Sequence, residues 1–158
     1  QMSLEGVIIN LRGDGFLNGW QKVYDEPYDH LTELSDLALP SDAKDVFVGA
    51  RAPDGSIALG AVGAASAVLK PTPLNAPVEH NGVWWYLTDG HSVGFSKCSK
   101  INQAQADDCT EDAEFRLSWH LSRGSGGYRA GSKLGLGFDR SWRKLVYCRA
   151  AVFTFKLS

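Results

Sequence analysis

The segment Phe115-Arg116-Leu117-Ser118-Trp119-His120-Leu121-Ser122 decides the fold class, because apolar and polar side chains alternate strictly along it. A period of two is typical of a β-strand that has one face in a hydrophobic core. The apolar set, which includes Leu117 and Trp119, is predicted to be that core face. The opposite face would then present a guanidinium, hydroxyls and an imidazole.

A second segment, Asn81-Gly82-Val83-Trp84-Trp85-Tyr86, continues the pattern with aromatic side chains. Trp84 and Tyr86 fall on one face of the predicted strand, and Val83 and Trp85 fall on the other. One face must be core, and the other is free to be exposed. If Trp84 and Tyr86 lie beside the polar face of the first segment, the sheet presents aromatic rings next to hydrogen-bond donors.

Turn residues separate about ten such strands along the chain. Pro53-Asp54-Gly55 between two apolar runs is a strong hairpin signal. Leucines at helical spacing predict one short helix near residues 30–39, which Pro40 would end. We therefore expect a mostly β fold, an antiparallel β-sandwich of jelly-roll-like type. The alternative is an α+β fold in which the helix packs on one sheet.

Length and composition favour one domain spanning residues 1–158, since 158 residues can bury a substantial core without cross-links. The net charge of −2 and the dispersed basic residues give no electrostatic footprint for nucleic acid. No apolar run is long enough to span a bilayer, so membrane insertion is not expected.

The chain has three cysteines, Cys98, Cys109 and Cys148. Cys98 and Cys109 flank a polar loop without strand or helix pattern, and we expect a disulfide between them. Cys148 lies in a predicted strand and would stay unpaired, so its redox state is left open. The alternative is three reduced thiols.

Two further motifs are weak. The acidic residues 107–112 offer hard oxygen ligands for calcium but lack EF-hand spacing, so a solvated loop is favoured and calcium is left open as a cofactor. Arg12-Gly13-Asp14 spells a tripeptide that integrins recognise, at a predicted turn, but it is too short to be specific.

No motif predicts an enzyme. The glycine-rich stretch 123–129 lacks the Lys-Ser/Thr of a phosphate loop, and the four histidines show no metal spacing. The serine-hydrolase and dinucleotide fingerprints are also missing from the sequence. A glycoside hydrolase with an unrecognised carboxylate pair stays as an alternative, because carboxylate separation cannot be read from sequence.

The polar and aromatic faces together predict a carbohydrate site. The C–H face of a sugar ring stacks on aromatic side chains, and planar polar groups bind its hydroxyls. We expect Trp84 and Tyr86 to stack, Arg116 and His120 to donate hydrogen bonds, and Asn81 and Arg129 to lie at the rim. The alternative is that the tryptophans are core residues.

Three segments, Gly19-Trp20-Gln21-Lys22-Val23-Tyr24, Asn81-Gly82-Val83-Trp84-Trp85-Tyr86 and Gly126-Gly127-Tyr128-Arg129, resemble those of secreted lectin-like domains of the fibrinogen-related group. The resemblance covers about a quarter of the chain, and the order of the segments and the cysteine pairs of that group are not matched. It implies an extracellular role in glycan or protein binding, and no ligand residues are carried over from it.

Taken together, these observations predict a non-catalytic carbohydrate-binding module, extracellular or at the cell surface, with a glycan or a cell-surface glycoprotein as its partner. The alternative is a protein-adhesion module that uses the same aromatic face or the Arg12-Gly13-Asp14 turn.

Overall fold

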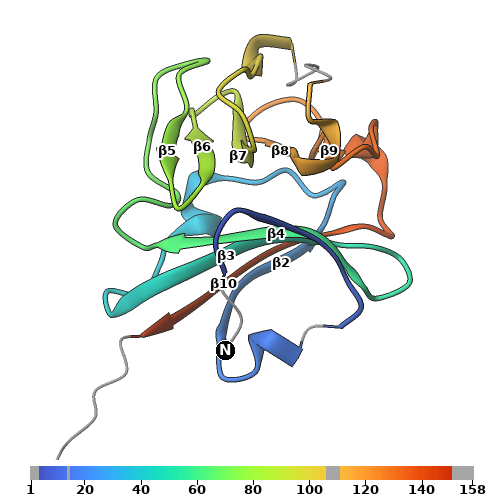
Figure 1. The fold of residues 1–158 in the computed structure, drawn as a ribbon. Coiled ribbons are helices and arrows are strands. Elements are labelled where there is room, and N and C mark those ends of the chain that lie inside the picture. The colour runs from blue at the N-terminus through green and yellow to red at the C-terminus, as the bar shows by residue number, and fades with distance from the viewer. Residues whose placement is uncertain (1–3, 14, 106–110, 151–158) are drawn as a thin grey trace, which may run out of the picture.

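The computed structural model describes residues 4–13, 15–105 and 111–150. Over these residues the chain forms two five-stranded antiparallel sheets that pack face to face around a shared core (Figure 1). The prediction of a mostly β, antiparallel fold is confirmed.

The first sheet has the spatial order β1-β4-β3-β10-β2. Its strands are β1 (Val7–Leu11), β2 (Gln21–Pro27), β3 (Ala43–Arg51), β4 (Ile57–Ala64) and β10 (Arg143–Ala150). The predicted hairpin at Pro53-Asp54-Gly55 joins β3 to β4. Asp54 accepts hydrogen bonds from the backbone and hydroxyl of Ser56, and Gly55 has a φ of 92°, which glycine adopts without steric cost.

The second sheet has the order β5-β6-β7-β8-β9, so strands that follow one another in sequence are also neighbours in space. Its strands are β5 (Val78–His80), β6 (Val83–Leu87), β7 (Ser92–Ser96), β8 (Leu117–His120) and β9 (Arg129–Ala130). Figure 1 shows this sheet above the first one, with the segments that join the two sheets running between them.

The predicted helix over residues 30–39 is wrong. The segment contains only a 3-10 turn, η2 (Leu34–Leu37), and the part of the chain that the structure describes has four other 3-10 turns and no α-helix. The α+β alternative fails for the same reason.

Tertiary contacts explain why the leucine pattern there does not become a helix. Thr32 is buried and forms an isolated parallel bridge with Leu121, just after β8, and its carbonyl accepts a hydrogen bond from the amide of Ser122 at 2.9 Å, so the backbone here is extended and not helical. Pro40 disfavours helical geometry at Leu39. Of the leucines in this segment, Leu37 is buried in the core, whereas Leu34 is 41% exposed and Leu39 is half-buried.

The core lies between the sheets. Leu117, Trp119 and Leu121 are fully buried, as predicted, and so are Phe95 of β7 and Val146 of β10. A second, smaller cluster covers the outer face of the first sheet around Phe47. Gly49 and Gly60 lie under the Phe47 ring, and a Cβ at Gly49 would lie 2.5 Å from a ring atom.

No helix in the described part of the chain is both long and apolar enough to cross a membrane.

Candidate functional site

Five of the six predicted ligand residues lie on one face of the second sheet. The strand register places Trp84 opposite Ser96 and Tyr86 opposite Gly94, and it places Gly94 opposite Ser118. Residues opposite one another in an antiparallel pair share a face. His120 and Arg129 join this face through the same ladders, and Arg116 joins it by alternation with Ser118. This face points away from the core.

Much of this face is closed to solvent. Tyr86, Arg116 and Arg129 are each at most 2% exposed, whereas Trp84 and His120 are half-buried. Tyr86 donates a hydrogen bond from its hydroxyl to the carbonyl of Leu117 at 2.8 Å, so the side chain crosses the neighbouring strand β7 at Gly94, the residue opposite Tyr86 in the ladder. The predicted stacking role of Tyr86 is therefore not available in this structure, because its ring is packed against the sheet itself.

Arg116 holds the loop that covers the face. Its guanidinium donates to the carbonyl of Glu111 at 2.6 Å and to that of Lys100, and it contacts the sulfur of Cys98 at 3.1 Å. Arg129 likewise donates to a backbone carbonyl, that of Gly131, at 3.0 Å. Both guanidinium groups therefore donate hydrogen bonds to backbone carbonyls and are buried from solvent.

His120 contacts Ser125 in the glycine-rich loop. Its Nδ1 lies 2.8 Å from the Ser125 carbonyl oxygen and 3.0 Å from the hydroxyl. A carbonyl only accepts hydrogen bonds, so Nδ1 carries the proton and cannot remove one from the Ser125 hydroxyl. Desolvation lowers the pKa of His120, assisted by the charges of Lys144 and Arg123 and opposed by the Ser125 bond. The contact between His120 and Ser125 therefore attaches the glycine-rich loop to β8, and His120 does not act as a base toward the Ser125 hydroxyl.

Asn81, the sixth predicted residue, lies apart from this face. It occupies the left-handed region (φ 57°) in the turn between β5 and β6. Its side-chain amide donates to the carbonyls of Leu4 at 2.9 Å and Val62 at 2.7 Å. These bonds join the chain before β1, the strand β4 and the β5–β6 turn, so the amide has a structural role.

The predicted disulfide is not formed, because Cys98 is a free thiol in the structure. Cys98 instead lies next to the guanidinium of Arg116. Cys109 lies outside the described residues. Cys148 is a buried free thiol on β10, and burial raises its pKa.

The weaker motifs fall partly outside the described residues. Asp14 of the Arg12-Gly13-Asp14 sequence and residues 107–110 of the acidic loop are among those not described. Within the described residues there is no group of three or more His, Cys, Asp or Glu side chains that could hold a metal ion.

A buried lysine that the sequence analysis missed lies between the sheets. Lys144 on β10 is 0% exposed, and its ammonium donates to the carbonyls of His30 and Gly126 and to the hydroxyl of Thr32 at 2.8 Å. These three acceptors use all three of its N–H groups. Desolvation lowers its pKa to about 7, and nearby carboxylates, Asp36 foremost, oppose this shift. The alternation of Lys144 with Val146 and Cys148 was a signal that it faces the core.

Around this lysine the buried aromatic hydroxyls are also paired. Tyr24 bonds to the Thr32 hydroxyl at 2.8 Å, and the indole N–H of Trp119 donates to the Tyr28 hydroxyl at 3.1 Å. Tyr28 in turn donates to the carbonyl of Arg129 at 3.1 Å. These hydrogen bonds form two buried groups, one around Thr32 and Lys144 and one around Tyr28, which pair the polar atoms between the sheets.

A cavity of about 270 Å³ lies between the edge strands of the two sheets, β1 and β9. Half-buried Trp142 forms part of its wall, together with apolar atoms of Ile9 and Leu59. The lining also includes three exposed polar residues: Asn10 with an amide, Glu114 with a carboxylate and Ser132 with a hydroxyl.

The backbone of Trp142 is held rigidly by Asp139. The Asp139 carboxylate accepts hydrogen bonds from the amides of Ser141 at 2.7 Å and Trp142 at 2.9 Å, and from the Ser141 hydroxyl at 2.8 Å. Desolvation acts to raise the pKa of Asp139, but these bonds outweigh it and the pKa lies below its ordinary value. The indole is thus presented by a turn whose geometry is fixed.

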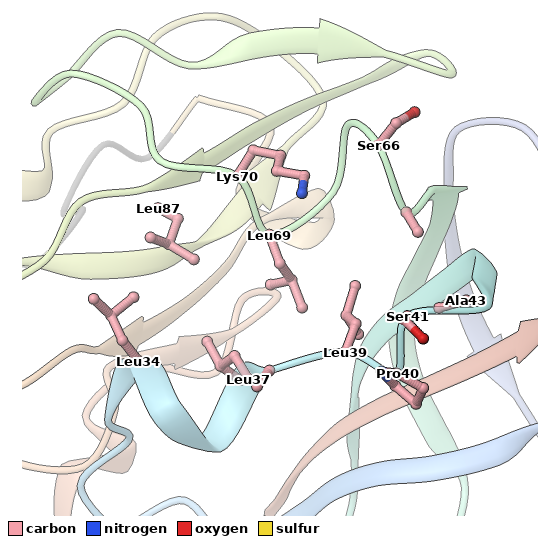
Figure 2. Close-up of a pocket in the computed structure, with 12 residues that line it drawn as sticks. Leu34, Leu37, Leu39, Pro40, Ser41, Ala43, Ser66, Leu69, Lys70 and Leu87 are labelled. Carbon is pink, nitrogen blue, oxygen red and sulfur yellow. The ribbon is translucent and has the colours of Figure 1, made fainter.

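A second cavity, of about 570 Å³, is an open groove (Figure 2). Five leucines, three alanines and a proline line it together with the polar residues Ser41, Ser66 and Lys70. Leu34, Leu37 and Leu39 line one side and Leu69 lines the other, with Lys70 at the rim. The spacing of Leu34, Leu37 and Leu39 predicts a helix face, but in the structure these residues line one side of the groove.

Searches of protein-family models, of curated proteins and of solved structures each find no match for this chain.

Proposed function

We propose that this domain binds a carbohydrate without altering it, and that a sugar ring occupies the cavity at Trp142. The observation that carries the proposal is a tryptophan in a cavity wall beside an exposed amide, carboxylate and hydroxyl, those of Asn10, Glu114 and Ser132. A sugar ring needs this combination, because its C–H face is apolar and its edge carries hydroxyls that both donate and accept.

The size and stiffness of the cavity support the same role. About 270 Å³ lies close to the lower end of the volumes of small-molecule sites, roughly 300–1,000 Å³, and would suit one sugar unit. The Asp139 turn fixes Trp142 before a ligand arrives. A preformed site loses less conformational entropy when it binds.

Binding fits this cavity better than hydrolysis. Canonical glycosidases place two carboxyl groups on either side of the bond to be cleaved. Among the described residues that line the cavity, Glu114 contributes the one carboxylate. Glu114 is therefore assigned as a hydrogen-bond acceptor for sugar hydroxyls.

The proposed site differs from the one expected from the sequence. Tyr86, Arg116 and Arg129 are buried by their own sheet and loop, so the proposal moves the stacking role to Trp142. The reason is that a loop folds over the polar face of β8, whereas the edge between β1 and β9 stays open.

The test is a glycan-array screen, run with calcium and again with EDTA, followed by titration of the best hit. Trp142→Ala should abolish binding, and Trp142→Phe should retain part of it because a flat ring remains. Trp20→Ala is the matched control, because Trp20 is also half-buried but packs beside Phe47 on the other face of the first sheet.

Asn10→Gly tests the polar side of the cavity. Asn10 lies in β1 with a φ of 57°, which glycine also adopts, so this change removes the amide without adding backbone strain. We expect weaker binding by about tenfold, the effect of one lost hydrogen bond of about 1.4 kcal/mol. The proposal is contradicted if no glycan binds, or if folded Trp142→Ala binds as tightly as the unaltered protein.

A further inference from the structure

The leucine groove contains a strained residue. Leu69 has a φ of 60°, and the other non-glycine residues with positive φ in the described chain are Asn, Asp or Ser. Left-handed backbone is tolerated by Asn and Asp but is sterically costly for a bulky apolar residue such as leucine. Strain of this kind gathers at ligand-binding sites, where the surrounding structure maintains it.

Both sides of the groove are stiff. Leu39 and Lys70 each precede a proline, Pro40 or Pro71, which confines their backbone to extended conformations. Thr72 anchors the Lys70 side to β6, since its amide donates to the carbonyl of Leu87 at 2.8 Å and its hydroxyl accepts from the Leu87 amide at 3.0 Å. The groove is thus preformed.

The apolar lining of the groove is open to solvent, although a folded chain would normally bury such surface. Leu34 is 41% exposed, and Leu39 and Leu69 are half-buried. The volume of about 570 Å³ lies within the range of about 300–1,000 Å³ that small-molecule sites occupy. Burial of this apolar surface by a ligand would therefore be favourable.

The charge of the lining selects the kind of ligand. Lys70 is exposed at the rim, and none of the described residues that line the groove is acidic. In Figure 2 the Lys70 side chain lies above Leu69 and points toward the Ser66 side of the groove. An apolar groove with one ammonium group at its rim is complementary to a hydrocarbon chain that ends in an anion.

We propose that this groove binds a free medium-chain carboxylate, with the hydrocarbon chain against Leu34, Leu39 and Leu69 and the carboxylate at Lys70. This site is separate from the cavity at Trp142, and the two share no lining residue. The inference therefore stands or falls independently of the carbohydrate proposal.

The test is calorimetric titration of the full chain with decanoate, below its micelle concentration, and with decanol. Decanoate should bind more tightly than decanol. Lys70→Gln should weaken decanoate binding by about fivefold, the effect expected for an exposed ion pair, and should leave decanol binding unchanged. Lys133→Gln, at an exposed lysine outside the groove, is the control and should change neither.

A pair of leucines tests the apolar side without threatening the fold. Leu34 and Leu74 are both 41% exposed, but only Leu34 lines the groove. Leu34→Ser should weaken both ligands by at least threefold, and Leu74→Ser should not. The proposal is overturned if decanoate does not bind, or if Leu34→Ser and Leu74→Ser change its affinity equally. It is also overturned if the groove binds a second copy of the chain, or lipid vesicles, and not free decanoate.

Discussion

The ammonium of Lys144 donates a hydrogen bond to the hydroxyl of Thr32 at 2.8 Å, in the interior between the two sheets. Thr32 belongs to the segment that crosses from β2 to β3, and Lys144 lies on β10. Together with the carbonyls of His30 and Gly126, this contact fastens two irregular segments to the first sheet. A buried cation here makes the stability of the fold dependent on pH.

Lys144 should destabilise the protein near neutral pH and do so less as the pH rises. Its pKa of about 7 in the fold lies below the ordinary value near 10.4, so between these values the unfolded chain binds more protons than the native one. The free energy of unfolding contributed by this group therefore rises with pH, by up to about 1.4 kcal/mol per pH unit.

Urea unfolding of the native protein and of Lys144→Met at pH 7.5 to 9.5 (roughly the window between the two pKa values) measures this effect. The difference in unfolding free energy should grow with pH, whereas Lys133→Met, at an exposed lysine, should give a constant difference. Burial raises the pKa values of Tyr24 and Tyr28, so these two groups lower the free energy of unfolding as the pH rises, but only at higher pH than this window. Both tyrosines are present in the native protein and in Lys144→Met, so their contributions cancel in the comparison. A pH-independent difference for Lys144→Met would contradict the prediction.

Two histidines should carry their proton on Nδ1. His80 accepts a hydrogen bond at Nε2 from the amide of Ala64 at 2.9 Å, which leaves the proton on Nδ1. His120 faces the Ser125 carbonyl with Nδ1, which must therefore be the donor. Nitrogen-15 chemical shifts of the imidazole rings at pH 7.5 distinguish the two tautomers, and Nε2–H signals for either residue would show that the hydrogen bonds are not as described.

His120 should also titrate below the ordinary histidine value near 6.5, because desolvation disfavours its charged form. Since the folded pKa is depressed, this group costs stability as the pH falls below about 6.5, where the unfolded chain takes up the proton more readily. A proton NMR titration measures the pKa directly. His120→Gln should remove the corresponding loss of unfolding free energy between about pH 6.5 and pH 5.

Leu69→Gly should be more stable than Leu69→Ala. Both variants lack the leucine side chain, but alanine keeps the steric cost of a φ of 60° and glycine does not. We expect a difference of about 1 kcal/mol in the free energy of unfolding, the reverse of the usual order of these two residues. The same pair of substitutions at Leu34, whose φ is not positive, is the control and should favour alanine.

Gly94→Ala should destabilise the second sheet by roughly 1–3 kcal/mol, the usual cost of overpacking a core position. A Cβ at Gly94 would overlap the Leu117 carbonyl and lie 2.8 Å from the Tyr86 hydroxyl oxygen. The matched control is Gly15→Ala, since a Cβ there meets no atom within 4 Å. Thermal unfolding of both variants gives the comparison, and equal midpoints would contradict the close packing of Tyr86 on β7.

The candidate site was only partly predictable from the sequence. Alternation placed Trp84 with Tyr86 on one strand face and Arg116 with His120 on another, because side-chain direction along a strand is a local property. Only the strand register of the structure brings these two pairs onto the same face of the sheet. It could not show that Arg116 closes a loop over that face, since the loop has no regular pattern and its contacts join residues far apart in the chain. The Trp142 cavity was invisible for the same reason.

The sequence by itself determined the antiparallel β class, the hairpin at residues 53–55 and the core role of Leu117 and Trp119, since strand period and turn chemistry act over a few neighbouring residues. The tertiary structure decided that the leucines of residues 30–39 line a groove instead of a helix, and that Lys144 is buried. Those outcomes depend on which surfaces meet when the two sheets pack, and burial and desolvation arise only from that long-range packing.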